Sequence, residues 1–148
     1  MPARPAIQGI PASAKAAMRP HGHDIYMPLR CLLVDDNDAF LKAATLLLQR
    51  EGVAVVGTAS STAMALQEAQ ALRPDVLLVD IGLGDESGFD LAQLLALDGQ
   101  IGGTAVIMIS TRAEADYAEL IAESPVVGFL AKSELSGQEI ARILAQKS

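Results

Sequence analysis

The segment DVLLVDIGLGDESG, residues 75–88, places a carboxylate at the end of an apolar run and follows it with a loop of small residues. Residues 76–79 are all apolar, Asp80 ends the run, and three glycines lie within the next eight positions. A short apolar run bounded by turn residues is typical of a strand that is buried on both faces of a sheet. We therefore expect a central strand that carries Asp80 at its carboxyl end, with little side-chain bulk beside it.

Strand-like and helix-like segments alternate along the chain on both sides of this run. The strands are expected within residues 29–35, 53–59, 75–80, 104–110 and 126–132. The helices are expected within residues 38–52, 61–74, 87–97, 113–123 and 133–146. This (βα)5 order predicts an α/β fold, namely a doubly wound, flavodoxin-like sheet of five parallel strands in the order 2-1-3-4-5.

The composition fits a single cytoplasmic domain and argues against two classes of partner. The chain has 148 residues, and no stretch approaches the roughly 18–20 consecutive apolar residues of a membrane helix. Residues 31–148 hold 7 basic and 17 acidic side chains, a net charge of −10. Direct binding to nucleic acid is therefore not expected, because attraction to phosphates dominates that affinity. The single cysteine, Cys31, lies in an apolar run and is expected to be a buried thiol.

The first 28 residues differ from the rest of the chain. Residues 1–26 contain four prolines and no sustained apolar period, and residues 1–30 carry a net charge of +3. We expect residues 1–28 to form a disordered extension and residues 29–148 to form the folded domain. The composition also resembles a transit peptide weakly, but the favoured interpretations are a flexible tail or an upstream start codon, with Met27 as the functional start.

Polar side chains stand at the ends of four of the five predicted strands. Asp35 and Asp36 end the first strand, Asp80 the third, Ser110 the fourth and Lys132 the fifth. Because ligands of such sheets bind at the carboxyl ends of the strands, these groups are expected to meet in one shallow cleft. Three neighbouring carboxylates repel one another, and Mg²⁺ would relieve the repulsion while it brings a phosphoryl donor next to Asp80.

Other interpretations of the single motifs are weaker. Asp36 or Asp38 could simply cap the first helix, which is the commoner role of one isolated acid. The acidic run after the first strand lacks the glycine and the closing glutamate of a calcium loop, and GLGDES lacks the third glycine of a dinucleotide site. A haloacid-dehalogenase-type phosphatase would need an acid where Gly82 stands.

Four motifs resemble the receiver domain of bacterial two-component response regulators, and the resemblance covers residues 29–148. The motifs are LLVDDND, LLVDIGLGDESGFDL, VIMIST and GFLAKSEL, in the order that the family shows. The resemblance implies that Mg²⁺ is held by Asp35, Asp36, Asp80 and the backbone carbonyl of Gly82.

The resemblance also assigns roles to the remaining polar groups and to one aromatic residue. Asp80 would be the phosphoryl acceptor, Lys132 the phosphoryl-binding ammonium, Ser110 the switch hydroxyl and Phe129 the switch aromatic. Gly84 departs from the family's pattern, which often has proline there, and the segment 113–126 is expected to pack unusually. Ser133 follows Lys132 where many members have proline. In lacking this proline, the chain is similar to receivers attached to helix-turn-helix output domains of the nitrate-regulator type, of the LuxR class.

The implied function is a signalling switch that takes its phosphoryl group from a sensor histidine kinase or a phosphotransfer protein. Such a receiver is not an enzyme beyond its own phosphoryl transfer and dephosphorylation. With no output domain recognised in the chain, the face of the fourth helix, fifth strand and fifth helix is expected to meet a separate output protein or a second copy. The alternative is a receiver-like interaction domain that acts without phosphorylation.

Overall fold

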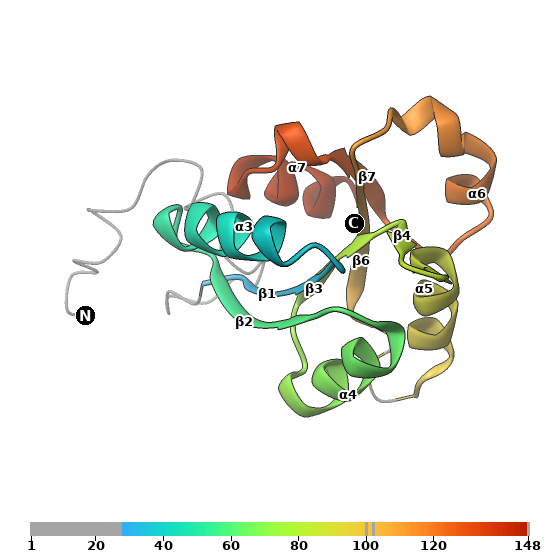
Figure 1. Ribbon diagram of the computed structural model, residues 1–148, viewed down its shortest axis with the longest axis horizontal. Helices are drawn as coiled ribbons and strands as arrows, with labels where there is room; N and C mark the ends of the chain where they lie inside the picture. Colours follow the sequence, from blue (N-terminus) through green and yellow to red (C-terminus); the bar gives the residue numbers. More distant parts are fainter. Residues whose placement is uncertain (1–27, 100, 102, 148) are drawn as a thin grey trace.

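A five-stranded parallel sheet in the order β2-β1-β3-β6-β7 forms the centre of the computed structural model, which describes residues 28–99, 101 and 103–147. The strands are β1 (Arg30–Val34), β2 (Ala54–Ala59), β3 (Val76–Asp80), β6 (Ala105–Ser110) and β7 (Gly128–Ala131). Counted within this sheet alone, the strands follow the order 2-1-3-4-5 (Figure 1). The predicted doubly wound, flavodoxin-like α/β fold is therefore confirmed.

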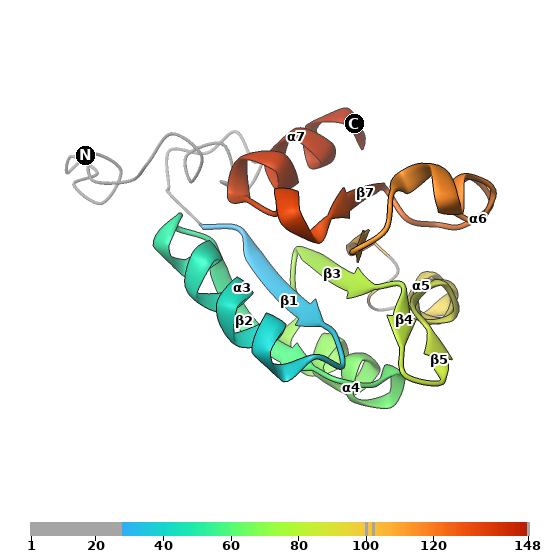
Figure 2. The same cartoon turned by 45° about the horizontal axis from the view of Figure 1, so that its top comes forward.

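Helices cover both faces of the sheet. The helices are α3 (Asp38–Arg50), α4 (Thr62–Leu72), α5 (Gly88–Leu97) and α7 (Gly137–Lys147). One core layer lies between the sheet and α3 with α7, and the other lies between the sheet and α4 with α5 (Figures 1 and 2). Leu33 and Leu78 point into the first layer, and Leu32 and Leu77 point into the second. All four are fully buried, which explains the unbroken apolar runs of β1 and β3.

Polar side chains cap the helices where they begin. Asn37, Ser61 and Ser87 each accept a hydrogen bond from a backbone N–H in the first turn of α3, α4 and α5. The Ser136 hydroxyl accepts from the backbone N–H of Glu139 at the start of α7. Each cap satisfies a donor that the first turn of a helix leaves without an internal partner.

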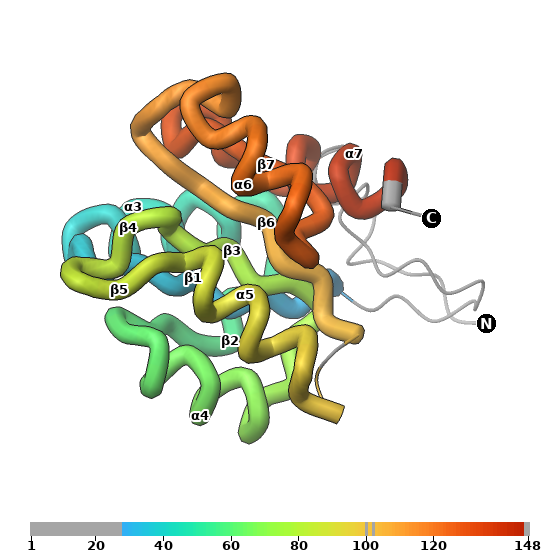
Figure 3. Tube along the Cα trace, turned by 90° about the vertical axis from the view of Figure 1, so that its right-hand side faces the viewer, coloured from blue at the N-terminus to red at the C-terminus, as the bar shows by residue number. Residues whose placement is uncertain are grey.

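Two features near the carboxyl edge of the sheet differ from the prediction. A hairpin of β4 (Gly82–Leu83) and β5 (Glu86–Ser87) follows β3 and leads directly into α5 (Figure 3). Its turn contains Gly84 at φ +62°, which proline cannot adopt and which explains this departure from the family's pattern. The single helix expected over 113–123 is wrong: a 3-10 turn, η1 (Glu114–Tyr117), precedes a short α6 (Ala118–Ala122), and neither has a side-chain cap.

Of the expected extension, residues 1–28, all but the last residue lie outside the described residues, so the domain boundary stays a prediction. Within the described part of the chain, no helix is long and apolar enough to span a bilayer. Cys31 is fully buried as expected, and this burial raises the pKa of its thiol.

Candidate functional site

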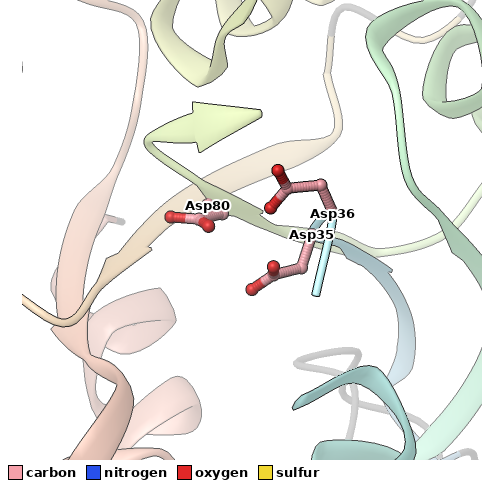
Figure 4. A group of neighbouring side chains, drawn as sticks. All are labelled: Asp35, Asp36 and Asp80. Atoms are coloured by element: carbon pink, nitrogen blue, oxygen red, sulfur yellow. The ribbon is translucent and has the colours of Figure 1, made fainter. Parts of the chain in front are cut away.

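The carboxyl ends of β1 and β3 bring three carboxylates together. Asp35 and Asp36 directly follow β1, and Asp80 is the last residue of the neighbouring strand β3. One oxygen from each of the three lies within 4.8 Å of the others, and Figure 4 shows the three side chains as neighbours at this edge of the sheet. Asp35 is fully buried, Asp80 is half-buried and Asp36 is exposed. The structure thus brings together the acids that the sequence placed at one edge of the sheet.

Lys132, which follows the end of β7, extends into this cluster. Its Nζ lies 2.5 Å from Asp35 Oδ2 and 3.4 Å from Asp80 Oδ2. The Lys132 side chain is 14% exposed and the Asp80 side chain 16%, so water screens their attraction only in part. Asp35 Oδ1 accepts a hydrogen bond of 2.8 Å from the backbone N–H of Asn37. Among the described residues, the Lys132 ammonium is the one partner of the buried Asp35 Oδ2.

Burial and neighbouring charge shift the protonation of both members of the pair. Burial raises the pKa of Asp80, the charge of Asp35 raises it further, and Lys132 opposes these effects only in part. Burial lowers the pKa of Lys132, but its contact with Asp35 and the charges of Asp80 and Asp35 outweigh burial, so this pKa is raised. The ammonium therefore stays charged, while Asp80 experiences a repulsion that a divalent cation would relieve.

The donor set fits Mg²⁺. This ion prefers oxygen ligands, keeps several of its waters and is commonly held by one or two carboxylates. A cation held by these acids would share the buried Asp35 Oδ2 with the Lys132 ammonium, which lies 2.5 Å from it, and would use the more exposed oxygens of Asp36 and Asp80 as well. The backbone N–H of Gly82 donates a long bond of 3.4 Å to Asp80 Oδ1, which keeps the hairpin beside the acids. The role of the Gly82 carbonyl as a further ligand stays a prediction.

A glycine that the sequence analysis did not single out fixes the backbone beneath Asp80. A Cβ at Gly88 would collide with the backbone carbonyl oxygen of Asp80, and the Gly88 N–H donates to the carbonyl of Ile81 at 2.7 Å. The first residue of α5 therefore packs directly against the end of β3. The signal in the sequence was a glycine at a helix start, where a better helix former is otherwise expected. A Cβ at Gly82, in contrast, would meet nothing within 4 Å.

The two predicted switch residues lie on successive strands beyond β3: Ser110 on β6, which pairs with β3, and Phe129 on β7, which pairs with β6. Ser110 ends β6 with 5% of its surface exposed, and its Oγ accepts a hydrogen bond of 3.0 Å from the backbone N–H of Arg112. Phe129, in β7, is partly buried against the core layer under α4 and α5. It also lines a surface pocket of about 280 Å³ together with Ile121 and Val126. Their movement on phosphorylation stays a prediction.

Comparison with known proteins gives a consistent result. The family model of the response regulator receiver domain matches residues 31–144. The DNA-binding response regulator MtrA of Mycolicibacterium smegmatis is 30% identical over 122 residues, which cover 81% of this chain and 51% of MtrA. The chain thus spans about half the length of that relative.

Solved structures show the same architecture. The signal receiver domain of NarL from Mycobacterium tuberculosis matches with a TM-score of 0.66 and 27% identity, covering 80% of this chain and 94% of that one. The chemotaxis response regulator CheY4 of Vibrio cholerae matches with a TM-score of 0.67 and 22% identity, covering 81% and 98% respectively, which supports the fold.

Proposed function

The chain belongs to the response regulator receiver domain family, and we propose that it is a phosphorylation-switched signalling receiver with Asp80 as the phosphoryl acceptor. The observation that carries the proposal is the convergence of Asp35, Asp36 and Asp80 beside the Lys132 ammonium. Phosphoryl transfer depends mainly on positioning and on neutralising charge. In this proposal, Asp80 supplies the oxygen that accepts the phosphoryl group, the three carboxylates supply ligands for a cation, and Lys132 supplies a positive charge.

In the proposed reaction, Asp80 is the nucleophile. One of its carboxylate oxygens attacks the phosphorus of the donor, and the bond between phosphorus and the donor breaks with its electron pair going to the leaving group. The donor would be the phosphohistidine of a sensor histidine kinase or phosphotransfer protein. Lys132 Nζ, at 3.4 Å from Asp80 Oδ2, is near enough to pair with a phosphoryl oxygen once it forms.

Asp35, Asp36 and Asp80 would hold Mg²⁺, which neutralises charge on the transferring group when bound. The product is an acyl phosphate on Asp80, and its hydrolysis returns the receiver to the starting state. The chain would catalyse only this transfer and this hydrolysis.

We further propose that the signal leaves through the surface formed by α6, β7 and α7, here called the output face. A phosphoryl group adds about −1.5 to −2 charges and three acceptor oxygens at Asp80. Ser110 Oγ accepts from the backbone N–H of Arg112, so its own O–H is available to donate to one of these oxygens once Ser110 moves toward the site. Phe129 lies on the adjacent strand and lines the pocket of the output face, so its ring can respond to that movement. The partner is a separate output protein or a second copy of the chain.

Treatment with acetyl phosphate and Mg²⁺ tests the acceptor. We expect one phosphoryl group on the wild-type chain by intact-mass measurement, and borohydride reduction followed by peptide mapping should locate it at Asp80. Chelation of Mg²⁺ and the Asp80→Asn substitution should each remove the modification while the circular dichroism spectrum stays that of a folded protein. Phosphate on the Asp80→Asn variant would refute the assignment. A folded wild type that takes up no phosphate would favour the alternative of an interaction domain that acts without phosphorylation.

Beryllofluoride, a mimic of the phosphoryl group, tests the output face. We expect amide chemical-shift changes at the acidic edge and also across residues 113–140. Changes that stop at the acidic edge would refute the proposed route, even if Asp80 is phosphorylated.

A further inference from the structure

The ring of Phe40, in the first turn of α3, lies against the Lys132 ammonium. Lys132 Nζ is 4.3 Å from the centroid of the ring, within the range in which a cation is attracted to an aromatic face. The same ammonium contacts Asp35 and Asp80, so a ring and two carboxylates surround it. We propose that Phe40 is a positioning residue for phosphoryl transfer and confines the Lys132 ammonium beside Asp80. This inference rests on the function proposed above.

Two hydrogen bonds fix the Phe40 backbone relative to the acidic cluster. The backbone N–H of Asn37 donates to Asp35 Oδ1 at 2.8 Å, and the Asn37 side chain accepts from the backbone N–H of Phe40 at 3.1 Å. The cap of α3 is therefore tied to a carboxylate of the site. Because the cap sets where the helix begins, it also sets where the Phe40 ring stands relative to Asp35.

Packing fixes the ring itself. Phe40 is partly buried and packs against the core layer under α3 and α7. The ring is therefore held in place by that core layer, with the Lys132 ammonium against its face. Lysine has a long, flexible side chain and a compact, strongly hydrated charge. Without the Phe40 ring, the Lys132 side chain would therefore be freer to turn toward solvent and toward the exposed Asp36.

An aromatic face suits this position better than another carboxylate would. Its attraction to a cation has little directional demand and adds no charge. The Lys132 ammonium has three N–H donors, so a small shift lets it meet a phosphoryl oxygen on Asp80 while it stays beside Asp35. A ring at 4.3 Å allows that small shift while it still keeps the ammonium in the cluster.

Rates of phosphorylation by acetyl phosphate at saturating Mg²⁺ test the inference on the full chain. We expect Phe40→Leu, which keeps an apolar side chain but removes the aromatic face, to lower the rate constant by roughly three- to tenfold. The matched variant Phe40→Tyr keeps the face and should stay within about twofold of the wild type. In a Lys132→Met background, Phe40→Leu should have no further effect, because its target is gone. An unchanged rate for Phe40→Leu, or an equal loss in both backgrounds, would overturn the proposal.

The ring-current shift of the Lys132 ε-methylene protons supplies a readout that does not depend on phosphorylation. NMR of lysine-labelled protein should show these protons shifted upfield in the wild type and in Phe40→Tyr, and near their ordinary position in Phe40→Leu. If the wild type takes up no phosphate but shows the shift, the proposed function fails while the geometry stands. If the wild type is phosphorylated and the shift is absent, the role of Phe40 is refuted alone.

Discussion

Replacement of Lys132 by methionine should destabilise the protein, because it leaves the Asp35 carboxylate buried without its ionic partner. Asp35 has no exposed surface, and Lys132 Nζ is 2.5 Å from its Oδ2. Removal of one partner from a buried ion pair typically costs 3–5 kcal/mol. The backbone N–H of Asn37 still bonds the other oxygen, so we expect a loss near the lower end, about 3 kcal/mol.

A double-mutant cycle isolates the pair. Asp35→Asn removes the charge but keeps an oxygen that can accept from Asn37, so this change in the Lys132→Met background should recover much of the loss. We expect a coupling free energy of about 2 kcal/mol between the two positions. Urea denaturation in the presence of a chelator, with all four variants at one pH, gives the free energies of unfolding. Unequal m-values would show that a variant has altered more than this pair.

Magnesium should act as a substitute for the missing ammonium. A cation that binds only the folded state stabilises it by RT ln(1 + [L]/Kd), so added Mg²⁺ should stabilise Lys132→Met more than the wild type. A coupling free energy below about 0.5 kcal/mol, together with equal Mg²⁺ stabilisation of both proteins, would refute this account of the buried pair.

Three further predictions concern the same edge of the sheet. Since the pKa of Asp80 is raised in the folded protein, its contribution to stability is full below the unfolded-state pKa of about 3.9 and is lost as the pH rises through the folded-state pKa. Urea denaturation at a series of acidic pH values should show that Asp80→Asn removes this pH-dependent loss of unfolding free energy. If the loss persists unchanged in the variant, it belongs to another group. Gly88→Ala should cost roughly 1–3 kcal/mol of unfolding free energy through its collision with the Asp80 carbonyl. Gly82→Ala should change it by less than about 0.5 kcal/mol, and equal effects would contradict the packing argument. Asp36→Ala should raise the melting temperature in chelator and weaken Mg²⁺ binding by calorimetry, and an unchanged affinity would count against the metal site.

The fold could be predicted from the sequence because short runs of neighbouring residues indicate each strand and most of the helices. Four apolar residues before Asp80 are enough to indicate a strand buried on both faces, and serines before apolar periods indicate helix starts. Parallel topology then places strand ends at one edge, so the meeting of Asp35 and Asp80 follows without knowledge of any contact.

The remaining features depend on tertiary contacts that no local pattern encodes. Phe40 looks like one apolar residue of an amphipathic helix, and only the folded chain brings its ring to Lys132. The need for glycine at position 88 comes from the backbone of a different element. The segment after β6 failed as a helix prediction because its apolar period is short and its first turns have no side-chain cap.

The unequal burial of the three acids gives the site a direction of approach. Asp36 lies at the solvent rim, Asp80 partway in and Asp35 at the floor. An ion that binds here would meet Asp36 first, where dissolved salt screens the attraction, and would reach Asp35 only after losing part of its hydration. Capture and retention would thereby be divided between two adjacent residues: Asp36 would govern how fast a cation arrives and how ionic strength alters that rate, and Asp35 would govern how long it stays.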